Sequence, residues 1–473
     1  MKNVSIVGSG PAGFYTAYRL LKKAVEPLSV KIWEKRPIPF GLSRFGVAPD
    51  HPEVKNCEET FTSIFTETLS NGHKVQFLGD VEIGNGGVKL MDLLSKEDVV
   101  VLSYGCSDDR RLHIPGEANA SGVFTSREFV NWYNGDLNMS QPDSKLNQFD
   151  WNKVKNVGII GNGNVALDIT RVLISNKIKE IWDPTDISVM ALEKLRKAPI
   201  ENIKIIGRRD FVHSKFTNKE LRELWELEKF GIHGKIDSKY FDPEQLLQQF
   251  GKNRPLKRRI EMCMEYLKPF EKRSPKYKKF EQFAGLVDTP SWELDYLKTP
   301  VRINSDIETG AIKSLTLHGN KISEENRLTN DGTEYTYNID LLIESLGYKG
   351  KPLQEFDELG IKFNDHVSTN AKGQVLTMSD AIVPRLYATG WIRTGSKGVI
   401  AATMQDAFTV ADSVLNEVSA TNANLGGFNT QDIPHTTWSD WEKINLSEIS
   451  KGAVLKKSRL KYLSYAEMLR CLD

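Results

Sequence analysis

The sequence contains few cysteines, and they form no motif. Its 473 residues include four, Cys57, Cys106, Cys263 and Cys471, which are too scattered for a CxxC pair, a zinc-ligand spacing or a four-cysteine iron–sulfur motif. Any electrons that this chain transfers therefore do not pass through a cluster or a dithiol of its own, and no metal site is predicted.

Long apolar segments and excess charge are also missing. No segment approaches the roughly 18 to 20 apolar residues that span a bilayer. The first strand-like run begins at Val4, so we expect no signal or transit peptide within the chain, and an earlier removal of a leader stays open. Lysine and arginine total 63 against 62 aspartate and glutamate, and this net charge of +1 argues against a polybasic nucleic-acid binder.

The N-terminal segment has the pattern of a strand, a glycine turn and a helix. A β-branched run at residues 4–7 leads into the G-x-G-x-x-G motif of residues 8–13, and an apolar-periodic stretch follows. A second strand-like run, residues 28–33, ends in Glu34. This order predicts a βαβ unit that binds a dinucleotide, and an ordinary tight turn is the alternative.

Each glycine of this motif has a distinct task. Gly8 allows the tight turn, Gly10 lets the backbone approach a pyrophosphate, and Gly13 lets the helix pack on the strand. The helix N-terminus supplies unpaired N–H groups for phosphate, and Glu34 is placed to accept hydrogen bonds from ribose hydroxyls.

The same pattern recurs downstream. The run at residues 157–160 precedes the turn at residues 161–166, and the next strand, residues 203–206, ends in Arg208 and Arg209 instead of an acid. The fold class is therefore α/β with two Rossmann-like dinucleotide-binding domains. Because the two strand ends carry opposite charge, we expect the two sites to bind different nucleotides.

The second turn uses Gly161 and Gly163 as the first turn uses its glycines, and Ala166 is a small third residue that still permits close packing. Arg208 and Arg209 suit an adenosine 2′-phosphate, which guanidinium groups bind through charge-assisted hydrogen bonds. The pair therefore predicts NADPH in preference to NADH, against the alternative of a solvated arginine pair at a strand end.

Two later segments also carry interpretable patterns. A glycine turn at residues 395–398 precedes a helix-like run at residues 399–410. The turn either offers N–H groups to a flavin or is an ordinary helix cap.

The stretch from residue 252 to 279 holds eleven basic and three acidic residues, and it predicts a docking site for an acidic protein, with a solvated basic loop as the alternative. Nucleic acid is less favoured, because no reading motif accompanies the charge.

The segment PFGLSRFGVAPDHPEVKN at residues 39–56, with the motifs at 161–168 and 398–401, resembles the adrenodoxin reductase family, the mitochondrial NADPH:ferredoxin oxidoreductases. The match is closest to fungal members and extends from about residue 4 to 408. It implies an FAD-binding domain at residues 1–105 and 346–473, with an NADPH-binding domain at residues 106–345 inserted into it.

The resemblance also implies roles for single residues. Besides Gly8, Gly10 and Gly13, the FAD contacts would be Ala12, Glu34, Leu42, Val81, Trp391, Gly398, Val399 and Ile400. Besides Gly161, the NADPH contacts would be Asn162, Gly163, Asn164, Val165, Arg208, Arg209, Glu220 and Gly398. The catalytic pair would be His51 and Asp168, and the partner contacts Arg222, Arg254, Arg258 and Arg259.

Three of these residues have structural alternatives. Glu220 follows Thr217 at the spacing of a capping box, which explains an acid there as well as a ligand role does. His51 is equally consistent with a hydrogen-bonded structural histidine in a proline-flanked loop, and Trp391 with a core tryptophan.

The family implies that FAD takes a hydride from NADPH and passes single electrons to an acidic [2Fe–2S] ferredoxin, in support of iron–sulfur cluster, haem or sterol pathways. The expected protein is a monomer in the mitochondrial matrix or at the inner membrane. Two alternatives are the FAD/NADPH subunit of a glutamate-synthase-like enzyme and a non-catalytic nucleotide sensor. NADPH bleaches the flavin band of an enzyme and leaves the spectrum of a sensor unchanged.

Overall fold

The computed structural model describes residues 1–67, 72–279, 289–420 and 424–472. These residues form two compact units. The first comprises Met1–Asp109 and Gly347–Asp473, and the second comprises Arg110–Leu346, so the second unit interrupts the first along the chain.

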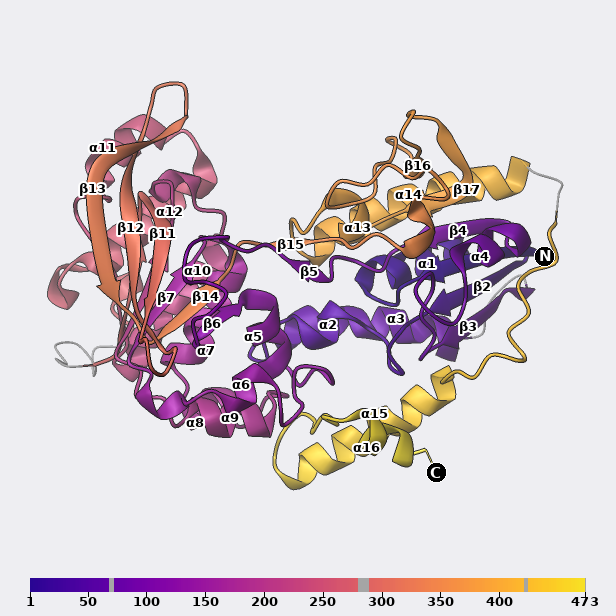
Figure 1. Cartoon of the computed structure of the whole chain (residues 1–473), viewed down its shortest axis with the longest axis horizontal. Helices are drawn as coiled ribbons and strands as arrows, with labels where there is room; N and C mark the ends of the chain where they lie inside the picture. The colour runs from indigo at the N-terminus through magenta and orange to yellow at the C-terminus, as the bar shows by residue number, and fades with distance from the viewer. Residues whose placement is uncertain (68–71, 280–288, 421–423, 473) are drawn as a thin grey trace. The chain divides into compact units, whose positions relative to one another are not determined.

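A six-stranded sheet forms the centre of the first unit (Figure 1). In spatial order its strands are β16 (Gln374–Leu376), β17 (Ile382–Ala388), β4 (Val99–Leu102), β1 (Lys2–Val7), β2 (Leu28–Trp33) and β3 (Lys74–Leu78). All neighbours are parallel except β16, the antiparallel edge strand. The strand order reverses between β1 and β4, which is the point where such sheets bind ligands at their carboxyl ends.

The helices of the first unit bring distant parts of the chain together. Helix α1 (Pro11–Lys23) packs against α14 (Ile400–Ala420), and Arg19 forms an ion pair with Asp412 at 2.8 Å. The remaining helical segments before residue 400 are α2 (Leu42–Phe45), η1 (Pro52–Asn56), α3 (Cys57–Thr66), α4 (Leu90–Lys96), η9 (Gln354–Phe356) and α13 (Trp391–Thr394). A short ribbon of β5 (Asp108–Asp109) and β15 (Tyr348–Lys349) completes this unit.

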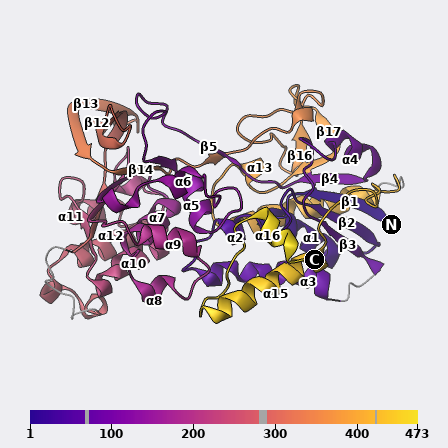
Figure 2. The same cartoon turned by 60° about the horizontal axis from the view of Figure 1, so that its bottom comes forward.

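The C-terminal tail, for which the sequence offered no prediction, is helical. It forms α15 (Trp438–Val454) and α16 (Tyr465–Arg470), drawn in yellow in Figure 2. Thr437 and Asp440 cap α15 reciprocally, and the ring of Trp438 stacks on Phe65 with 4.0 Å between centroids. The tail is thereby fixed to α3.

The second unit contains a fully parallel six-stranded sheet. Its spatial order is β6 (Val123–Thr125), β14 (Leu341–Glu344), β7 (Asn156–Ile160), β8 (Asn202–Ile206), β10 (Ser291–Asp295) and β9 (His233–Ile236). Its α-helices are α5 (Ser126–Tyr133), α6 (Lys145–Gln148), α7 (Asn164–Ile174), α8 (Lys179–Trp182), α9 (Val189–Leu195), α10 (Asn218–Trp225), α11 (Pro243–Phe250) and α12 (Arg254–Leu267). Short 3₁₀ turns connect them at η3 (Trp151–Lys153), η4 (Phe211–His213), η5 (Glu226–Phe230), η6 (Phe270–Lys272) and η7 (Pro275–Tyr277).

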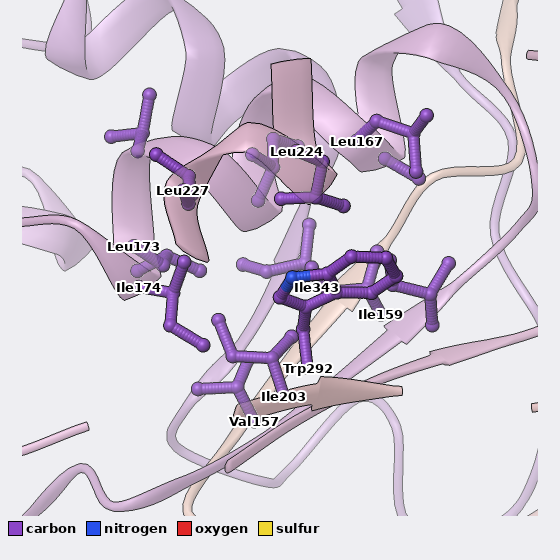
Figure 3. Packing of buried hydrophobic residues seen from close by; sticks show 14 of the residues in the cluster. Val157, Ile159, Leu167, Leu173, Ile174, Ile203, Leu224, Leu227, Trp292 and Ile343 are labelled. Atoms are coloured by element: carbon purple, nitrogen blue, oxygen red, sulfur yellow. The ribbon is translucent and has the colours of Figure 1, made fainter. Parts of the chain in front are cut away.

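The core of this unit lies between the sheet and its helices. Figure 3 shows the ring of Trp292, from β10, among Ile203 of β8, Val157 of β7 and Leu224 of α10, all four nearly or fully buried. Burying large apolar side chains in this way contributes about 1.5–3 kcal/mol for each, and it fixes the strands whose ends carry the predicted site residues.

An antiparallel sheet that the sequence did not predict joins β10 to β14. Its strands are β11 (Lys298–Ser305), β12 (Ile312–Ile322) and β13 (Leu328–Asn338). In contrast, the predicted strand–turn–helix segments are confirmed as β1 with α1 and as β7 with α7. Both Rossmann-like units of the expected α/β fold are therefore present.

Candidate dinucleotide sites

The first glycine turn has the shape that a pyrophosphate needs. Gly8 has φ +103°, and a side chain there would place its Cβ 2.6 Å from the Cα of Tyr104. A Cβ on Gly13 would overlap the carbonyl oxygen of Gly8. At Gly10, by contrast, no heavy atom of the described residues lies within 4 Å of the added Cβ. Gly8 and Gly13 are thus required by packing, and Gly10 leaves an open approach to the N-terminus of α1.

The start of the segment at residues 39–56, which carries the family resemblance, lies directly on this turn. The backbone N–H of Phe40 donates to the carbonyl of Ser9 at 2.9 Å, and a Cβ on Gly41 would lie 3.2 Å from the Cα of Gly10. Leu42 begins α2 immediately afterwards and is half-buried. Leu42 is therefore held beside the turn, as the FAD assignment requires.

Two more segments meet the same region. Val81 is buried, and its N–H donates to the carbonyl of Glu34 at 2.9 Å. Val81 therefore lies beside the end of β2. A Cβ on Gly390 would overlap the Cβ of Ala12 in the first turn of α1. Gly390 therefore lies against the first turn of α1, and Trp391 is the next residue in the chain.

Glu34 is engaged locally in this structure. Its Oε2 accepts hydrogen bonds from the backbone N–H of Ser9 at 3.1 Å and from the Ser9 hydroxyl at 2.7 Å, and its Oε1 accepts from the N–H of Arg36 at 3.0 Å. A carboxylate has about four acceptor sites. Glu34 therefore retains capacity for a ribose hydroxyl, and the local bonds fix its position at the strand end.

The C-terminal residues assigned to FAD are half-buried or exposed. Trp391 is half-buried, with its ring centroid 5.9 Å from that of Tyr348, so it is not a fully buried core tryptophan. Gly398 has φ +83°, Val399 is 52% exposed, and Ile400 is the first residue of α14. These residues therefore lie at the N-terminus of α14, and their contact with FAD stays a prediction.

The second glycine turn repeats the geometry of the first. Gly161 has φ +126°, and a Cβ there would overlap the carbonyl oxygen of Ser345. Near Gly163, no described heavy atom comes within 4 Å of an added Cβ, and Ala166 is fully buried. Since both turns are open only at the second glycine, both fit a dinucleotide pyrophosphate.

The strand after the second turn ends in the predicted arginine pair. Arg208 is exposed just beyond β8. The guanidinium of Arg209 donates through Nη1 to the side-chain oxygen of Asn326 and through Nη2 to its backbone carbonyl, the latter at 3.3 Å. A cationic strand end in place of Glu34's carboxylate is the clearest chemical difference between the two units.

The capping-box interpretation of Glu220 holds in one direction only. The hydroxyl of Thr217 accepts from the N–H of Glu220 and donates to Oε2 of its carboxylate, but the N–H of Thr217 donates to Oδ1 of Asn164 at 2.7 Å instead of to the glutamate. This bond ties α10 to the second glycine turn, which places Glu220 near Asn164. A ligand role for Glu220 stays a prediction.

His51 and Asp168 belong to different units. His51 is 7% exposed and lies just before η1 in the first unit. Asp168 is half-buried on α7 of the second unit, where its Oδ1 accepts from Nη2 of Arg171 at 3.0 Å. The catalytic assignment of both residues therefore continues to rest on the family resemblance.

The basic stretch contains helix α12 and the short turns η6 and η7. On α12, Arg254 and Arg258 are exposed, and Arg222 is exposed on α10. Arg259 is half-buried, and its guanidinium donates to the carbonyls of Ser214 and Phe216 at 3.0 and 2.7 Å. Arg259 thus holds the loop before α10, and simple charge counting overstates the surface charge by including it.

Comparisons with known proteins agree with this geometry. The chain is 56% identical to the probable mitochondrial NADPH:adrenodoxin oxidoreductase of Saccharomyces cerevisiae, over 99% of this chain and 96% of that protein. The chain belongs to the NADPH:adrenodoxin oxidoreductase family. The human mitochondrial NADPH:adrenodoxin oxidoreductase is 34% identical over 99% of this chain and 91% of its own length.

Solved structures and domain models extend the adrenodoxin oxidoreductase assignment to the fold. The structure of Mycobacterium tuberculosis FprA in complex with NADPH matches with a TM-score of 0.83 and 27% identity over 100% of both chains. A model of the NAD(P)-binding Rossmann-like domain matches residues 6–69, which include the first glycine turn. Among the described helices, none is both long and apolar enough to cross a membrane.

Proposed function

We propose that this chain is a mitochondrial NADPH:ferredoxin oxidoreductase whose first unit binds FAD and whose second unit binds NADPH. The observation that carries the proposal is the pair of matching glycine turns with opposite strand ends, Glu34 in the first unit and Arg208 with Arg209 in the second. Full-length similarity to NADPH:adrenodoxin oxidoreductases favours it over a glutamate-synthase-like subunit or a sensor.

FAD, when bound, accepts a hydride and releases electrons singly, which suits a one-electron ferredoxin. The residues of this chain bind and orient. The N–H groups of α1 at Gly10 receive the FAD pyrophosphate, Glu34 accepts from the ribose, and the N-terminus of α14 supplies further donors. In the second unit Gly163 receives the pyrophosphate of NADPH, and the arginine pair neutralises the 2′-phosphate.

A coupled assay tests this function. We expect the purified protein to reduce cytochrome c with NADPH when an acidic [2Fe–2S] ferredoxin is added. Reduction at the same rate without ferredoxin would show that the partner is unnecessary, and no reduction with it would contradict the proposal.

The exposed arginines on α10 and α12 are the proposed ferredoxin contacts. Reversing Arg254 and Arg258 to glutamate should slow ferredoxin-dependent cytochrome c reduction by about 10- to 1000-fold at low salt, because the steering charge is lost. Reduction of ferricyanide by NADPH needs no docking and should stay near the wild-type rate.

The matched control replaces Lys177 and Lys179 by glutamate; both are exposed lysines elsewhere in the second unit. It should leave both rates near wild type. If Arg254→Glu with Arg258→Glu slows both assays equally, or if the control pair has the same effect on ferredoxin, α12 is not the docking surface.

Proton handling is assigned to His51 and Asp168 by family resemblance. A proton-handling His51 predicts that His51→Gln changes the pH profile of NADPH-dependent ferricyanide reduction. Superimposable profiles for the variant and the wild type would remove this role and leave His51 as a structural residue.

We also propose that the protein is a monomer of the mitochondrial matrix or of the matrix face of the inner membrane. Helix α15 supports a membrane contact, since Leu446 and Val454 are 64% and 82% exposed and lysines 443 and 451 lie on the same helix. Flotation with anionic vesicles should carry the protein upward, and sedimentation should give the monomer mass. Failure to float removes the membrane contact.

A further inference from the structure

The antiparallel sheet of the second unit supports the backbone of the arginine pair. The N–H of Gly207 donates to the carbonyl of Asp295 at 2.8 Å, and the N–H of Lys298 donates back to the carbonyl of Gly207 at 3.1 Å. The N–H of Leu297 donates to the carbonyl of Arg209 at 3.3 Å. The segment that carries Arg208 and Arg209 is therefore bonded to the start of β11.

The base of this contact is buried. Lys298 is 2% exposed, its ammonium donates to the hydroxyl of Tyr240 at 2.8 Å, and it forms an ion pair with Asp295. The ring of Tyr240 lies 4.3 Å from the same ammonium. These contacts attach the start of β11 to Asp295 and Tyr240, next to residues 207–209.

Two asparagines of the sheet extend the support to the arginines themselves. Asn320 of β12 is 7% exposed, and its Nδ2 donates to the carbonyl of Arg208 at 2.9 Å and to the hydroxyl of Thr299 at 2.8 Å. Asn326, between β12 and β13, accepts from both terminal nitrogens of Arg209 through its side chain and its carbonyl. One asparagine holds the backbone of the pair, and the other holds a guanidinium.

We propose that Asn320 and Asn326 are positioning residues that set selectivity for a 2′-phosphorylated nucleotide. The inference rests on the proposed NADPH site. A guanidinium has five N–H donors. Since Asn326 takes two of them, three remain for the phosphate, and the side chain is held in one orientation before the ligand arrives. Restricting a rotamer-rich side chain in advance reduces the entropy lost on binding.

The test uses adenosine 2′,5′-bisphosphate and 5′-AMP as probes, with affinities measured by titration calorimetry. Asn326→Gly suits its φ of +61° and removes only the side-chain acceptor. Asn320→Leu removes the donor to Arg208 at similar volume. We expect each variant to bind the bisphosphate about 3- to 10-fold more weakly, the range of one hydrogen bond, and 5′-AMP unchanged.

Asn330→Ala is the matched control, because Asn330 lies on β13 and its side chain bonds to Gly332 and His318 instead. It should bind both probes like the wild type. Asn326→Gly in an Arg209→Ala background should have no further effect, since Asn326 acts through Arg209.

The outcomes separate this inference from the proposed function. If Arg208→Ala with Arg209→Ala leaves bisphosphate affinity unchanged, the NADPH assignment fails. If that double variant weakens binding but Asn326→Gly and Asn320→Leu do not, the arginines act alone and the positioning role is wrong. A loss of 5′-AMP affinity equal to that for the bisphosphate would show general disruption of the site and would also overturn the inference.

Discussion

Replacing Arg208 and Arg209 by alanine is expected to raise the KM for NADPH by about 100-fold or more. Each charge-assisted hydrogen bond contributes about 1.5–3 kcal/mol, roughly 10- to 150-fold in affinity. NADH has no 2′-phosphate, so its KM should change little. Steady-state ferricyanide reduction with both nucleotides measures the ratio directly.

Arg302→Ala provides the control for this pair. Arg302 is an exposed arginine on β11 of the same unit, and its loss should leave the preference for NADPH intact. An unchanged ratio of the two KM values in the double alanine variant would mean that the 2′-phosphate is bound elsewhere.

Replacing Glu448 by alanine is expected to lower the free energy of unfolding of the first unit by about 3–5 kcal/mol. Glu448 of α15 is fully buried, and both of its carboxylate oxygens accept from Nη2 of Arg44 at 2.6 and 2.7 Å. Arg459 donates to the same carboxylate at 2.9 Å. Removing the carboxylate leaves the 3% exposed guanidinium of Arg44 without its counter-charge.

The same variant should also retain less FAD, because Arg44 belongs to the α2 segment that lies on the first glycine turn. Urea denaturation followed by fluorescence, together with flavin content after gel filtration, measures both effects. Ser450→Ala on an exposed position of α15 is the control and should behave like wild type. If Glu448→Ala lowers the free energy of unfolding by less than about 1 kcal/mol, the stabilising role of the cluster of Arg44, Glu448 and Arg459 is wrong.

The cluster also has a predictable pH dependence. Burial raises the pKa of Glu448, but the charges of Arg44 and Arg459 outweigh it and hold the pKa below the ordinary value of a glutamate. A carboxylate with a depressed pKa stabilises the folded state above its unfolded pKa of about 4.3 and loses that contribution as the pH falls. The difference between wild type and Glu448→Gln should therefore be full at neutral pH and shrink on acidification below this value.

Local patterns predicted the dinucleotide units well, because their signals are contained in short segments. The run at residues 28–33 became β2 with the same bounds, since a β-branched strand followed by Glu34 needs no distant information. The helix expected at residues 399–410 exists as α14 but continues to Ala420. Val410, Val414 and Val418, all buried, continue the helical spacing beyond residue 410, so the expected range was too short.

Other features depend on contacts that a linear pattern does not reveal. The burial of Glu448 and the use of Arg259 inside the loop before α10 both require partners from distant segments. Strands β11 to β13 were missed because their polar residues resemble loop sequence. The start of α15 did carry a usable signal, since Thr437 and Asp440 have the spacing of a capping box before Trp441 and Ile444.

Anaerobic titration of the purified protein with NADPH, followed in the visible spectrum, tests most directly whether one chain binds both FAD and NADPH productively. The flavin band should be present after purification and should bleach with NADPH at concentrations at which NADH has little effect. A folded protein that is colourless and cannot be reconstituted with FAD, or a flavin band that NADPH leaves unchanged, would contradict the assignment of the two units.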